Sequence, residues 1–211
     1  MNDLVLRELG DVERLAAAYA PGPLRGTYRA VLALDALLAR ASLMPGEALP
    51  AQLRLAWWRD ACQRFGNRAE HPVLQALAKN WPGGANALVM LVDAWEEMAA
   101  GSGNFSQSVE CVAGARAAVF AQCARVGEQM TRAPVECWTL VSLARYSPAV
   151  MQHEMMLRTA AAIELPRLPS ALRPLRVLAG LAQRAARRSQ SNLIGDPRSP
   201  IVALRLGIFG R

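Results

Sequence analysis

Apolar side chains recur every three or four residues along most of the chain, and proline or glycine interrupts this repeat at intervals. Such spacing gathers side chains on one face of a helix, whereas a strand would alternate them. Prolines at the start of segments and glycines at their ends are typical of helix boundaries. We therefore predict a single bundle of eight or nine helices, which cover about residues 3–20, 24–43, 50–65, 72–79, 85–100, 106–130, 134–147, a segment ending near 163, and 170–189.

The pattern changes after residue 189. Residues 190–200 are polar and rich in turn-forming residues, and residues 201–209 form a short apolar stretch that contains Arg205. We predict a helical domain over residues 1–189 and a C-terminal tail over residues 190–211. The tail would either dock on a protein partner, a membrane surface or another copy, or pack loosely on its own domain as a frayed terminus.

Composition supports an all-α fold. Hydrophobic residues make up 53% of the 211 residues and charged residues 19%, which excludes a disordered chain. Alanine and leucine dominate and are strong helix formers. Charged residues near the N-terminus and the absence of any apolar stretch of about 18 residues argue against a secretory signal and a membrane span. We expect the protein in the cytoplasm, or peripherally on a membrane surface that faces it.

Positive charge is the second feature of the composition. The formal net charge is +7, and Lys79 is the only lysine, so arginine carries nearly all of the positive charge. Arginine suits diphosphates, anionic membranes and nucleic acids. A compositional bias would explain the choice of arginine over lysine, but not the net charge. The one dense cluster, Arg184 with Arg187 and Arg188, is typical of a solvated helix end, and we expect no nucleic-acid partner.

Cysteine and histidine are few and scattered. The four cysteines show no CxxC spacing, and His71 and His153 are isolated from them and from each other. This distribution gives no support to a zinc, iron–sulfur or thioredoxin-type site. We expect the cysteines to be reduced residues of the core.

The most distinctive segment is Arg54–Asp60, with the sequence RLAWWRD. Adjacent tryptophans on a helix point about 100° apart, so that one can enter the core while the other lines a groove or faces solvent. Arg54 lies one turn earlier, where its guanidinium could stack on an indole. From the residues alone, the segment is a helix-packing anchor.

This segment resembles the WWRD-containing branch of the squalene/phytoene synthase family. Further segments resemble the family in the same order along the chain. They are ALDALLAR at residues 33–40 preceded by Arg25, PVLQAL at 72–77, VDAWE at 92–96, and LP followed by LRPL at 165–175. The resemblance implies an isoprenoid synthase fold around a central cavity. The branch includes relatives regarded as respiratory-complex assembly factors.

Catalysis in this family would need metal-binding carboxylates. Ionising a prenyl diphosphate requires Mg²⁺, and aspartates four residues apart on a helix present suitable oxygens. The resemblance places the first such motif at residues 39–43, which read ARASL, and the second between about residues 111 and 163, where no two carboxylates lie within four residues. Asp93 with Glu96 and Glu97 is a close acidic set, but such sets usually form a solvated helix face.

We therefore expect a non-catalytic protein without a cofactor, which binds a prenyl chain or another lipid or serves as an assembly scaffold near a membrane. The candidate ligand contacts are Arg25, Tyr28, Asp35, Arg40, Arg54, Trp58 and Arg59. The alternative is a working prenyltransferase that holds Mg²⁺ through unorthodox ligands. Those ligands would be Asp35, Asp60, Asp93 or Glu97.

Overall fold

The computed structural model describes residues 2–43, 48–64, 71–101, 104–196 and 198–209. Within these ranges all regular secondary structure is helical and there is no strand, which confirms the prediction of a single all-α domain. The α-helices are α1 (Asn2–Glu8), α2 (Asp11–Ala18), α3 (Arg25–Ser42), α4 (Ala48–Gln63), α5 (Pro72–Asn80), α6 (Ala85–Ala100), α7 (Phe105–Ala124), α8 (Arg132–Ala144), α9 (Val150–Ala162), α10 (Arg173–Ala186) and α11 (Ser199–Phe209). Three short 3₁₀ turns, η1 (Gly22–Leu24), η2 (Glu128–Met130) and η3 (Ser170–Leu172), precede α3, α8 and α10.

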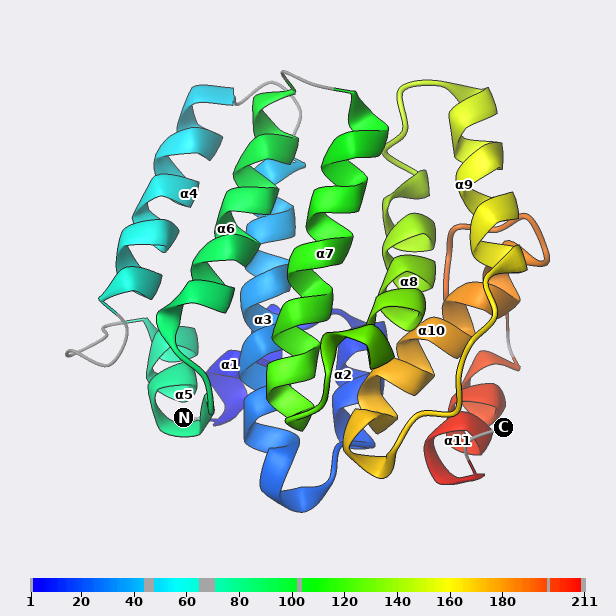
Figure 1. Ribbon diagram of the computed structural model, residues 1–211, viewed down its shortest axis with the longest axis horizontal. Helices are drawn as coiled ribbons and strands as arrows, with labels where there is room; N and C mark the ends of the chain where they lie inside the picture. The colour runs from blue at the N-terminus through cyan, green and yellow to red at the C-terminus, as the bar shows by residue number, and fades with distance from the viewer. Residues whose placement is uncertain (1, 44–47, 65–70, 102–103, 197, 210–211) are drawn as a thin grey trace.

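Five of the longer helices stand side by side in one row, in the order α4, α6, α7, α8 and α9 (Figure 1). Helix α3 lies behind α6 and α7 and packs against both. The short helices α1, α2 and α5 lie at one end of the row, where α10 also crosses α8 and α9 at an angle. This arrangement surrounds α3 with neighbours and leaves α4 and α9 at the two edges.

The predicted count of eight or nine helices was too low and one predicted helix was too long, because two features of the backbone cannot be inferred from apolar periodicity. The expected helix over residues 3–20 divides into α1 and α2, since Gly10 is extended (φ −69°, ψ 170°) and caps α2. The expected helix over residues 106–130 ends at Ala124, since Arg125 adopts a left-handed conformation with φ 54°. Both breaks occur where the apolar pattern itself continues.

Residues after 189 also form a helix that the count did not include. Helix α11 packs against α10 and α2, and its Ala203 is fully buried. Asp196 in the preceding turn pairs with Arg184 and Arg188, so two residues of the basic cluster are tied to the tail. Leu204 and two isoleucines, Ile201 and Ile208, remain exposed on the outer face of α11.

Aromatic side chains fill the middle of the bundle. Tyr28, Trp95, Phe120 and Trp138 come from α3, α6, α7 and α8, and each is at most 2% exposed. The ring centroids of Phe120 lie 5.8 Å from those of both Tyr28 and Trp138, at tilted or edge-on angles that favour aromatic packing. Among the described helices, none is long and apolar enough to cross a membrane.

Candidate functional site

A buried ion pair lies beside this aromatic core. Asp35 of α3 accepts hydrogen bonds from Arg116 of α7, with Nε at 3.0 Å from Oδ1 and Nη2 at 2.8 Å from Oδ2. The two side chains are only 5–6% exposed. Trp95 of α6 donates a third bond to the same carboxylate, from Nε1 to Oδ1 at 2.9 Å. Three helices therefore meet on one carboxylate.

The other side of the Arg116 guanidinium is equally occupied. Its Nη1 donates to Thr139 Oγ1 at 3.1 Å and to Ser142 Oγ at 3.3 Å, both on α8. The guanidinium also lies over two indoles, 4.1 Å from the Trp138 ring centroid and 5.2 Å from that of Trp95. All three nitrogens of Arg116 thus donate to protein atoms. These four hydrogen bonds engage four of the five N–H groups of the guanidinium, and such a network fixes the geometry of neighbouring helices.

A cavity of about 420 Å³ opens next to the ion pair. One wall is formed by Asp35, Ala36, Ala39 and Arg40 of α3 and by Leu43 just after it. The other lining residues include Glu13, Trp138, Ser142, Arg145 and Tyr146. Burial raises the pKa of the Glu13 carboxyl, and the nearby negative charge of Asp35 raises it further. The Arg145 guanidinium lies over the Tyr146 ring at 4.8 Å and makes no ion pair with any residue that the structure describes. Arg145 is exposed at this cavity without an ion pair among the described residues, and its charge acts on Glu13, where it partly offsets the increase in pKa.

The predicted ligand contacts do not converge on this cavity. Asp35 and Arg40 line it, although Arg40 pairs with Glu8 of α1. Tyr28 is buried, and its hydroxyl donates to the carbonyl of Ala171 at 2.7 Å, which ties α3 to η3. Arg25 is exposed at the start of α3 and donates to the carbonyl of Ala20 at 3.3 Å.

The remaining contacts lie on α4, at the edge of the row. Trp58 is 6% exposed and Trp57 is 50% exposed, which confirms that one indole enters the core and the other faces outward. The two rings meet edge to face with centroids 4.9 Å apart. Arg59 pairs with Asp93 at 2.7 Å and also with Glu96, and so joins α4 to α6, while Arg54 is exposed on α4. The hydrogen bond to Asp93 raises the pKa of Arg59.

No metal-binding cluster forms among the described residues: nowhere do three His, Cys, Asp or Glu side chains gather closely enough to hold an ion. Both Asp35 oxygens accept from Arg116, and Asp93 accepts from Arg59. Glu97 lies beside Cys111, whose pKa is raised by burial and by this neighbour. The four cysteines are free, and three of them are buried, as predicted for core residues.

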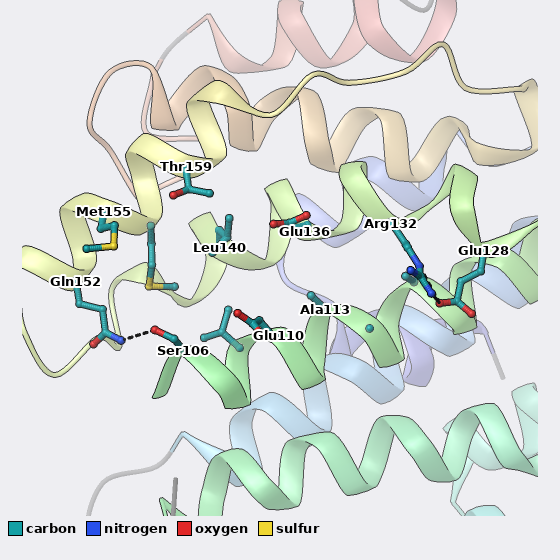
Figure 2. Close-up of a pocket in the computed structure, with 14 residues that line it drawn as sticks. Ser106, Glu110, Ala113, Glu128, Arg132, Glu136, Leu140, Gln152, Met155 and Thr159 are labelled. Atoms are coloured by element: carbon teal, nitrogen blue, oxygen red, sulfur yellow. Dashed lines mark hydrogen bonds and ion pairs between the residues drawn. The ribbon is translucent and has the colours of Figure 1, made fainter. Parts of the chain in front are cut away.

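A second hollow of about 470 Å³ runs along the other face of α7 (Figure 2). Helices α7 and α9 form its two walls, and α8 lies between them. Its lining combines small and apolar side chains with carboxylates. The lining residues are Ser106, Val109, Glu110, Ala113, Gly114 and Ala117 of α7, Glu128, Arg132, Glu136 and Leu140 beside or on α8, and Gln152, Met155, Met156 and Thr159 of α9. We call this hollow the α7–α9 groove.

Sequence reasoning named Asp35 but missed its partner Arg116, although a signal was present. Asp35 is the only charged residue between Arg29 and Arg40, and Arg116 is the only one between Glu110 and Arg125. A lone charge inside an apolar helical stretch is a candidate for burial, and a buried charge needs a partner of opposite sign. The two could therefore have been paired by elimination.

Comparison with known proteins adds no relative: no family model, no curated protein and no solved structure matches this chain.

Proposed function

We propose that this chain is a divergent, non-catalytic relative of the squalene/phytoene synthases that acts as a protein-binding scaffold. The observation that carries the proposal is the Asp35–Arg116 pair. Asp35 is the one carboxylate that α3 carries, one turn before the position of the first expected metal motif, and both of its oxygens accept hydrogen bonds from the Arg116 guanidinium. A carboxylate whose two oxygens are both bound by a guanidinium joins helices, and its charge is already neutralised, which disfavours Mg²⁺ binding.

The filled interior supports a scaffold over a prenyl carrier. Four fully buried aromatic side chains occupy the middle of the bundle, where the resemblance would place a central cavity. An isoprenoid synthase-like fold remains part of this proposal. In it, the RLAWWRD segment serves as the anchor of α4 on α6 through Trp58 and Arg59.

The test is incubation with farnesyl or geranylgeranyl diphosphate and Mg²⁺, with released diphosphate as the readout. We expect no release above the protein-free control. Release that is lost in Asp93→Asn, at a site that pairs only at the surface, would overturn the proposal. Asp35→Asn keeps the size of the side chain and tests the same point at the buried pair, provided that thermal unfolding shows a folded protein.

A second candidate function, binding of a lipid with an anionic head group, is favoured by the cavity beside the ion pair. Arg145 is exposed at that cavity and makes no ion pair among the described residues, and Ala36, Ala39 and Leu43 offer apolar surface nearby. Native mass spectrometry of protein purified from cells separates the two candidates. A co-purifying lipid that is lost in Arg145→Gln would favour lipid binding, and bare protein would favour the scaffold.

A further inference from the structure

The α7–α9 groove is a space between two helices into which a further helix could pack. Helices α7 and α9 each pack extensively against α8 but not against each other, apart from a hydrogen bond at one end from Gln152 to Ser106 at 2.9 Å. Figure 2 shows side chains of α7 and α9 facing one another across α8. The groove follows α7 from Ser106 to Ala117, a length of about 16 Å at the rise of an α-helix.

Small side chains line the α7 wall. Ala113, Gly114 and Ala117 face the groove on successive turns, and no atom lies within 4 Å of the place where a Cβ on Gly114 would stand. A second backbone can therefore approach α7 closely here.

The α9 wall is apolar and adaptable. Met155 and Met156 line it, and Met155 is 60% exposed. Flexible methionine side chains fit varied apolar surfaces and are common at binding sites that accept more than one partner.

The charge of the groove is opposite to that of the whole chain. Glu128 is paired with Arg132, which leaves Glu110 and Glu136 without an ion-pair partner among the described residues. The chain carries a net charge of +7, but charges farther away than about 8 Å are largely screened at physiological ionic strength. The groove therefore favours a cation, although the protein as a whole is basic.

We propose that the α7–α9 groove binds a cationic amphipathic helix of a partner protein. Apolar residues of that helix would lie on Leu140, Met155 and Met156, and its Lys or Arg side chains would pair with Glu110 and Glu136. This mode is helix-in-groove recognition, with apolar anchors three and four residues apart. The inference rests on the proposed scaffold function and specifies its partner surface.

The experiment measures binding of two capped synthetic helices of about 18 residues to the full chain by fluorescence anisotropy. Both carry the same leucine stripe. One has lysines on either side of the stripe, and the other has glutamates at those positions. We expect saturable 1:1 binding of the lysine peptide, at least tenfold tighter than that of the glutamate peptide, and weaker at higher salt.

Variants assign the binding to the groove. Gly114→Trp places an indole in open space within the groove and should remove binding, and Met155→Ser provides a milder change on the opposite wall. The double variant Glu110→Gln with Glu136→Gln should weaken the lysine peptide about threefold to tenfold and flatten its salt dependence. Glu164→Gln, which alters an exposed carboxylate outside the groove, is the matched control and should leave binding unchanged.

Three outcomes would overturn the proposal. They are equal binding of the two peptides, binding that survives in both Gly114→Trp and Met155→Ser, and no binding to the folded wild-type chain. A concentration-dependent dimer that Gly114→Trp abolishes would assign the groove to a second copy instead. None of these results affects the diphosphate-release test. The groove proposal can therefore be wrong while the protein is non-catalytic, and the groove proposal can be right even if diphosphate is released.

Discussion

Charged side chains on the two faces of α7 have opposite environments. On the inner face, Arg116 is buried and donates to Asp35, Thr139 and Ser142 through every nitrogen. On the outer face, Glu110 borders an open groove and has no ion-pair partner among the described residues. A charge that is removed from water must be satisfied by the protein itself, whereas a charge that stays in water is free to meet a partner. The inner face therefore holds the helices together, and the outer face is available for recognition.

The largest test of this contrast is removal of one partner from the inner pair. Arg116→Met leaves the Asp35 carboxylate buried without its counter-charge, and we expect a loss of about 3–5 kcal/mol of unfolding free energy. For a domain of this length, such a loss lowers the Tm by about 6–20 °C. Urea and thermal unfolding measure it.

The double variant Asp35→Leu with Arg116→Met is the companion to that experiment. It removes both charges and replaces them with apolar side chains, so most of the lost stability should return. A double variant as unstable as the single one would show that the pair contributes through packing with Trp138 and Trp95 rather than through its charges.

A smaller effect, of opposite sign, is expected on the outer face of α7. Gly114 is helical and has free space around its Cβ position, so Gly114→Ala should stabilise the protein by about 0.5–1 kcal/mol. Gly101→Ala is the matched control. Gly101 ends α6 at φ 58°, which an alanine adopts with strain, and the same substitution there should be destabilising. A loss of stability at Gly114 would mean that the groove is closed in solution.

We expect the smallest change in stability from the titration of Glu13, which lines the cavity beside the Asp35–Arg116 pair. The pKa of Glu13 is raised above its ordinary value of 4.5, mainly by burial. The folded state therefore holds this proton more tightly, and unfolding free energy should fall as the pH rises from about 4.5 through the raised pKa. Glu13→Gln should flatten this part of a stability–pH curve. Glu136→Gln, on the groove side, is the control, and a similar flattening there would assign the pH dependence to general charge repulsion.

Particular residues show which structural features the sequence predicts and which it does not. The pair Trp57 and Trp58 was correctly divided into an outer and an inner indole, because adjacent helical residues must point in different directions. The end of α7 was placed six residues too late, because the left-handed conformation of Arg125 is disfavoured for a non-glycine residue and carries no apolar signature. The candidate contacts Arg59 and Asp93 were named for different roles, yet they bind each other across α4 and α6.

By itself, the sequence determined the all-α class and most helix boundaries, since apolar period and the positions of proline and glycine are local properties of the chain. Only the tertiary structure decided that Asp35 meets Arg116 across 81 positions of sequence, and that α7 and α9 leave a groove between them. The pairing of Asp35 with Arg116 depends on how the faces of distant helices pack. The groove exists because α7 and α9 both pack on α8 and not closely on each other. Neither property can be inferred from a local stretch of the sequence.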